Sequence, residues 1–78
     1  MRTLREVFAT ILDVSATQLT KHSSPKSISS WDSVNNLLLI SEIEKEYGVT
    51  ITIEDVYRLT SLGDVFNFIK KHKVPVKF

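Results

Sequence analysis

The residues best placed to do chemistry form the run Trp31-Asp32-Ser33-Val34, which ends a polar loop and precedes an apolar helical pattern. The first turn of a helix offers backbone N–H groups without partners and a partial positive charge. A phosphodiester on Ser33 would lie against that terminus, where an anion gains about 0.3–1 kcal/mol. The alternative is that Asp32 and Ser33 only cap the helix, because such pairs are common at helix starts.

The chain contains 78 residues and no cysteine, which excludes disulfides and thiolate metal sites. A thioester carrier of this sequence would have to receive its thiol on a prosthetic group. A Ser-His-Asp catalyst built from Ser33 and His22 is not expected, because His22 lies in a loop and nothing resembles an oxyanion hole. His22 and His72 lack partners at metal-ligand spacing. We therefore predict neither an enzyme nor a metal site.

Composition is typical of a soluble globular domain, with 42% hydrophobic and 24% charged residues. The length suits one domain, which we assign to residues 1–73, with residues 74–78 as a C-terminal tail whose docking the sequence leaves open. The start of the chain lacks the apolar segment of a signal peptide, and no apolar run is long enough to span a bilayer. We expect a cytoplasmic protein without stable membrane insertion.

Charge is unevenly distributed although the formal net charge is only +1. Residues 34–58 carry five acidic and two basic side chains, and residues 59–78 carry four lysines and one aspartate. The basic run at residues 70–73 could contact nucleic acid or anionic lipid. Lysines also suit the C-terminus of a helix, however, and we expect no nucleic-acid partner.

The chain begins with an amphipathic helix, which a long polar loop follows. Thr3 and Glu6 have the spacing of a capping box, and one apolar stripe runs through residues 3–13. Residues 14–32 break this period and are rich in serine. A loop of this length in a small domain is more often functional than idle. Three apolar residues are expected to hold it to the core: Val14, Leu19 and Ile28.

Three further helices and one extended connector complete the predicted fold. A helix begins at the Asp32-Ser33 pair, one of which is its N-cap, and ends before Gly48. Residues 49–53 alternate like a strand but have no second strand to pair with, so we expect an extended connector with its apolar side chains inward. A short helix over residues 54–59 and a last helix over residues 61–69 follow. The prediction is an all-α bundle of four helices, three main ones and a short third one.

From Asp32 to about Ile69 the chain resembles the acyl and peptidyl carrier proteins without an apparent gap. The run Asp32-Ser33-Val34 matches their Asp-Ser-Leu-type attachment motif. The matching positions in the later helices are Leu39, Ile40, Ile43, Glu44-Lys45-Glu46-Tyr47-Gly48, Ile51, Val56, Leu59, Thr60-Ser61-Leu62-Gly63-Asp64-Val65 and Phe68-Ile69. The Leu4–Leu12 stripe and Leu19 resemble the family's first helix and the loop after it.

The resemblance implies that a phosphopantetheinyl transferase attaches a 4'-phosphopantetheine arm from coenzyme A to Ser33. Asp32 matches the residue that assists this loading, without holding a metal in the isolated carrier. The chain would be a monomeric carrier that exchanges acyl or aminoacyl thioesters with a loading enzyme and with synthase or transferase partners. The alternative is an unmodified, carrier-like helical adaptor that acts by protein contact alone.

Two features depart from the housekeeping carriers of fatty-acid biosynthesis in the resembling family. Trp31 precedes the Asp-Ser pair where those carriers usually have a smaller residue, and the chain is near neutral where they are strongly acidic. Both departures favour a specialised carrier of a modified lipid, polyketide or peptide-like pathway.

The helix after Ser33 carries apolar residues on two sides. At 100° per residue, one set is expected to face the core: Leu39, Ile40, Ile43 and Tyr47. A second set falls on the opposite side: Val34, Leu37 and Leu38. Either the long loop covers this second set, or it forms an exposed patch that partner enzymes contact. We expect the exposed patch, with three carboxylates that steer basic partners: Glu42, Glu44 and Glu46.

Overall fold

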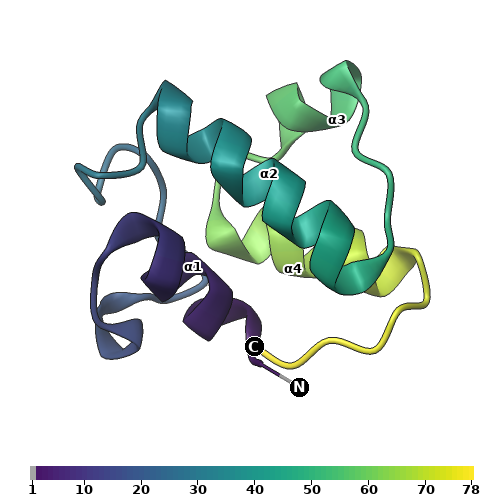
Figure 1. Ribbon diagram of the computed structural model, residues 1–78, viewed down its shortest axis with the longest axis horizontal. Coiled ribbons are helices and arrows are strands. Elements are labelled where there is room, and N and C mark those ends of the chain that lie inside the picture. Colours follow the sequence, from purple (N-terminus) through teal and green to yellow (C-terminus); the bar gives the residue numbers. More distant parts are fainter. Residues whose placement is uncertain (1) are drawn as a thin grey trace.

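Four α-helices and one short 3-10 helix make up the fold in the computed structural model, which describes residues 2–78. In chain order they are α1 (Leu4–Leu12), the 3-10 helix η1 (Ala16–Gln18), α2 (Ser33–Tyr47), α3 (Ile53–Arg58) and α4 (Leu62–Lys71) (Figure 1). No strand occurs between residues 2 and 78. The predicted all-α architecture, with three main helices and a short third one, is confirmed.

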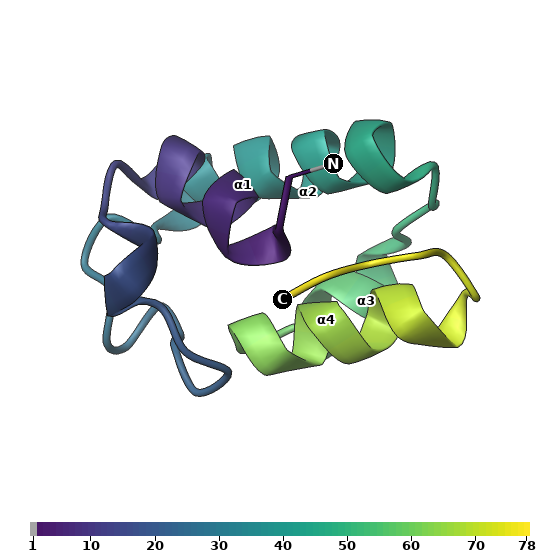
Figure 2. The ribbon, with the colours of Figure 1, turned by 90° about the horizontal axis from the view of Figure 1, so that it is seen from below.

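The helices form two layers, with α1 and α2 in one and α3 and α4 in the other (Figure 2). Helices α1, α2 and α4 turn an apolar stripe toward the space between the layers, where each fully buried large side chain contributes about 1.5–3 kcal/mol. The buried apolar residues are Leu4, Val7, Phe8, Leu12, Leu19, Trp31, Leu39, Ile43, Tyr47, Val49, Leu62, Val65 and Ile69. The short helix α3 has no buried residue, and its C-cap, Leu59, packs against the core.

The start of α1 follows the predicted capping box. The Thr3 hydroxyl accepts a hydrogen bond from the Glu6 backbone N–H at 3.2 Å, and the Glu6 carboxylate accepts one from the Thr3 N–H at 2.8 Å. The helix ends at Asp13, which adopts the left-handed conformation with φ of 55°. Helix α1 is therefore one residue shorter at each end than the predicted helix over residues 3–13.

The loop between α1 and α2 is held to the rest of the molecule at several points. Leu19 is buried, and Val14 and Ile28 pack against the core as predicted. The loop also caps α4, because the carbonyls of Ser23 and Lys21 accept the N–H groups of Leu62 and Gly63, both at 2.9 Å. A Cβ on Gly63 would lie 2.8 Å from the Lys21 carbonyl oxygen, so this close approach requires glycine. The 3-10 helix η1 is not among the predicted elements, and a capping box between Ser15 and Gln18 stabilises it.

The connector between α2 and α3 is extended as predicted, but one of its apolar side chains points outward. Val49 is buried and Ile51 is half-buried, whereas Ile53 is 73% exposed. Thr52 is the N-cap of α3, so Ile53 is the first helical residue and no longer follows the alternation of the connector. The prediction that Ile53 packs inward is wrong because the helix begins one residue earlier than expected.

The last five residues return to the N-terminus of α1 (Figures 1 and 2). The backbone carbonyls of Lys77 and Phe78 accept hydrogen bonds from the N–H groups of Leu4 and Arg5 at 2.8 and 3.1 Å. These carbonyls satisfy two of the N–H groups that the first turn of a helix leaves unpaired. The Phe78 ring packs edge-on against Phe66 at 5.5 Å between centroids. The sequence left open whether the C-terminal tail docks; in the structure it packs against the start of α1 and against Phe66 of α4.

Candidate functional site

Ser33 is the first residue of α2, and its side chain is exposed. Asp32 is the N-cap, and its Oδ1 accepts the Asn35 N–H at 2.8 Å. Among residues 2–78, the Ser33 hydroxyl and the N–H groups of Ser33 and Val34 make no hydrogen bond. The site therefore presents a free hydroxyl beside two free backbone donors at the positive end of a fifteen-residue helix.

Trp31 anchors the chain immediately before this site. Its indole is buried and packs edge-on against Phe8 of α1, with 5.2 Å between ring centroids. The indole Nε1 donates to the Asn36 Oδ1 at 2.9 Å, and the Asn35 side chain donates to the Ser30 carbonyl at 2.8 Å. The loop end is thus tied to the first turn of α2 by two side-chain hydrogen bonds, which restrict where Ser33 can point.

The anchoring roles of Trp31, Asn35 and Asn36 were not predicted from the sequence. A usable signal was present, because Trp31 and Asn36 occupy the positions before the N-cap and four residues into the helix. Apolar side chains at these two positions commonly form a hydrophobic staple. Here the pair instead makes a hydrogen bond across the same positions.

The two apolar sides of α2 lie as predicted. Leu39, Ile43 and Tyr47 are buried, and Ile40 is half-buried. On the other side, Val34 is 67%, Leu37 68% and Leu38 53% exposed. The loop before α2 does not cover them, so the exposed patch beside Ser33 is confirmed as a structural feature.

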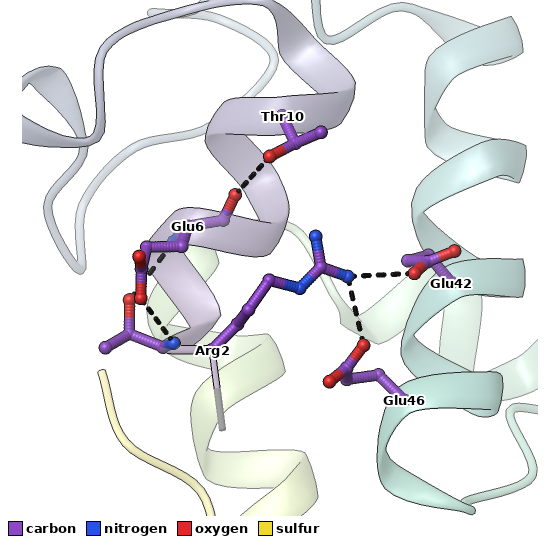
Figure 3. A network of polar contacts seen from close by, with 6 residues as sticks. Arg2, Glu6, Thr10, Glu42 and Glu46 are labelled. Carbon is purple, nitrogen blue, oxygen red and sulfur yellow. Dashed lines mark hydrogen bonds and ion pairs between the residues drawn. The ribbon is translucent and has the colours of Figure 1, made fainter.

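Two of the three predicted steering carboxylates are paired within the chain (Figure 3). The Arg2 guanidinium lies 2.9 Å from Glu42 and 3.0 Å from Glu46. The pKa of Arg2 is raised, chiefly by its hydrogen bond to Glu46 and against a smaller opposing effect of desolvation. Glu44 lies on another side of α2, where its carboxylate accepts the Ile51 N–H at 2.8 Å and holds the connector.

The remaining candidates of the sequence analysis lie apart from this site. The Nδ1 of His72 lies 2.8 Å from the Phe68 carbonyl oxygen at the end of α4. Within residues 2–78, no three side chains of the metal-ligating kinds gather in one place. No helix in this part of the chain is both long and apolar enough to cross a bilayer.

The residues at the start of α2 fit a phosphopantetheine arm. A phosphodiester ester-linked to Ser33 needs an accessible hydroxyl, room outside the helix and donors for its charge. The exposed Ser33, the free N–H groups of the first turn and the exposed Val34 meet these requirements. When bound, the group supplies the thiol that this cysteine-free chain lacks.

Comparison with known proteins identifies the family. Residues 2–69 match the family model described as phosphopantetheine attachment site. The chain is 40% identical over 42 residues to acyl carrier proteins of Rickettsia bellii, strains OSU 85-389 and RML369-C, and spans about half the length of these relatives. It is 30% identical over 69 residues to the acyl carrier protein of Clostridium acetobutylicum, a match that covers 88% of this chain and 90% of that protein. The chain belongs to the acyl carrier protein family, whose phosphopantetheine-attachment domain it forms.

Proposed function

We propose that this chain carries acyl or aminoacyl groups as thioesters on a 4'-phosphopantetheine arm attached to Ser33. The observation that carries the proposal is the free, exposed hydroxyl of Ser33 at the start of α2, inside the region that matches the attachment family. The chain acts as a carrier and leaves the chemistry to its partner enzymes.

Asp32 is proposed to assist the loading reaction. Its Oδ1 is engaged with the Asn35 N–H, whereas its Oδ2 makes no hydrogen bond within residues 2–78, and the side chain is exposed. One carboxylate oxygen is therefore available to the metal and pyrophosphate that the transferase assembles around Ser33. This arrangement supports a dual role, in which the same side chain caps α2 and contributes charge to loading.

The partner surface is proposed to be the exposed apolar patch of Val34, Leu37 and Leu38, which begins one residue after Ser33. An enzyme that contacts this patch would hold α2 close to the root of the arm. Glu42, Glu44 and Glu46 are proposed as the charged residues of the partner surface, although Glu44 lies on another side of α2 than Glu42 and Glu46 and is bonded to the Ile51 N–H. The partners are a phosphopantetheinyl transferase, a loading enzyme, and the synthase or transferase that accepts the acyl group.

The pathway is proposed to be a specialised one rather than bulk fatty-acid synthesis. The near-neutral net charge of +1 and the buried Trp31 before the attachment site support this choice. We further propose that the chain acts as a monomer in the cytoplasm.

An adaptor that works by contact alone is the competing function, since the exposed apolar patch would serve it equally well. Co-expression with a phosphopantetheinyl transferase of broad specificity, followed by intact-mass measurement, separates the two. A carrier gains the mass of one phosphopantetheinyl group, and Ser33→Ala does not. A wild-type chain that stays unmodified with several such transferases would identify the adaptor.

A further inference from the structure

The acidic edge of α2 is occupied by a cation from the same chain. Glu42 and Glu46 lie one helical turn apart and converge on the Arg2 guanidinium, which enters from the residues before α1 (Figure 3). The side chains are 40% exposed for Arg2, 32% for Glu42 and 27% for Glu46. The three side chains are thus accessible to a partner, but they already form ion pairs with one another.

This edge continues the proposed docking surface. Residues four apart on a helix are surface neighbours, so Val34, Leu38, Glu42 and Glu46 form one row along α2. The adjacent row consists of Leu37, Ser41 and Lys45. A partner that lies along α2 from the attachment site meets apolar side chains first and charged ones only in the second half of the helix.

The second half of these two rows is electrically neutral, because Glu44 lies on another side of α2 and is bonded to the Ile51 N–H. Glu42 and Glu46 contribute two negative charges, and Arg2 and Lys45 contribute two positive ones. A basic partner surface would gain little from this half, because it would have to displace Arg2 to reach the carboxylates. An apolar or weakly acidic partner surface meets no such obstacle.

We propose that Arg2 is a specificity-determining residue that neutralises the acidic edge of α2, so that the carrier accepts partner enzymes with an apolar contact surface and disfavours those with a basic one. This inference rests on the proposed function in taking α2 as the partner surface. It assigns to the segment before α1 a role in partner choice as well as in packing.

Binding of hexalysine to the unmodified chain tests the proposal, with the backbone amides followed by NMR. Arg2→Ala is expected to bind hexalysine about fivefold more tightly than the wild type, with the largest shifts at residues 42–46. Lys71→Ala is the matched control, because it removes the same charge from the exposed end of α4. The triple variant Arg2→Ala, Glu42→Gln, Glu46→Gln removes two negative charges and one positive charge, so it is expected to bind hexalysine no more tightly than the wild type.

Equal binding by Arg2→Ala and Lys71→Ala would overturn the proposal, as would shifts located away from α2. Thermal unfolding of each variant shows that the comparison is made between folded chains. No step uses the arm on Ser33, so a failure of loading and a failure of this inference give different results. Hexalysine binding is measured on the unmodified chain, so the effect of Arg2→Ala can be tested even if Ser33 is never loaded.

Discussion

The indole Nε1 of Trp31 donates a hydrogen bond to the Asn36 Oδ1 at 2.9 Å, and Ser33, the proposed attachment residue, lies between the two residues in the sequence. The indole is buried against Phe8, so this bond connects the core of the protein to the first turn of α2. The position of Ser33 is therefore determined from both sides. Ser33 therefore lies in a short segment that is fixed at both ends, at Trp31 and at Asn36, and not in a mobile loop.

Asn36→Ala should lower the free energy of unfolding by about 1–2 kcal/mol, because the buried indole N–H loses its acceptor. Urea unfolding measures this loss. Trp31→Phe removes the donor, and the double variant completes a thermodynamic cycle in which we expect a coupling of about 0.5–1.5 kcal/mol. Strictly additive effects would mean that the bond between the two side chains contributes nothing.

Asp32→Asn should slow the transfer of phosphopantetheine to Ser33 while leaving stability unchanged. Asparagine caps a helix about as well as aspartate, so the bond to the Asn35 N–H is retained and only the charge is lost. Loading rates from time-resolved intact mass, paired with thermal unfolding, make the comparison. If the two proteins load at equal rates, Asp32 is a cap and nothing more.

Leu38→Glu should change the free energy of unfolding by no more than about 0.5 kcal/mol and weaken transfer by a cognate partner enzyme. The side chain is 53% exposed on the proposed partner surface. The neighbouring Leu39 is only 1% exposed, and Leu39→Ala should cost about 2–5 kcal/mol as a matched contrast. A large loss of stability in Leu38→Glu, or unchanged transfer, would contradict a partner role for this face.

Acid should weaken the start of α1 through Glu6. Hydrogen bonding with Thr3 holds the pKa of Glu6 below its ordinary value of 4.5. The backbone N–H of Thr3 has the larger effect and its side chain the smaller one. The carboxylate therefore stabilises the folded state above that pH, and the stabilisation is lost as the pH falls through the lowered pKa.

Glu6→Gln retains the capping box but cannot titrate, so its stability should depend less on pH below about pH 5 than that of the wild type. Thermal unfolding over a series of acidic buffers measures the difference. Asp13→Asn serves as control, because the Asp13 side chain makes no hydrogen bond within residues 2–78. Identical pH profiles for Glu6→Gln and wild type would show that this carboxylate has no part in acid stability.

Much of the fold was predictable from local patterns. The capping boxes, the apolar stripes and Gly48, which ends α2 with φ of 66°, are signals that act over a few residues. They located all four α-helices and both sides of α2. Ile53 was misplaced because the strand-like alternation before it continues into the first residue of α3. Alternation alone does not reveal where a helix begins.

The contacts between distant segments were not predictable in the same way. Arg2 meets Glu42 across forty residues of sequence, and Lys77 meets Leu4 across the whole chain. Such pairs depend on how α1 and α2 pack and on where the last segment returns, which no local spacing encodes. The sequence therefore located Ser33 and Asp32 at a helix start, but not the side chains that anchor that start or neutralise the edge beside it.

Locating the arm on the chain is the most direct test of the central claim. Trypsin cleavage after Lys26 and Lys45 isolates one peptide with five serines: Ser27, Ser29, Ser30, Ser33 and Ser41. After incubation with coenzyme A, Mg²⁺ and a phosphopantetheinyl transferase, fragmentation of this peptide should place one phosphopantetheinyl group on Ser33 and none on the other four. Ser29→Ala should be loaded like the wild type, and Ser33→Ala should stay unmodified. A group found on another serine, or a Ser33→Ala chain that is still loaded, would contradict the account.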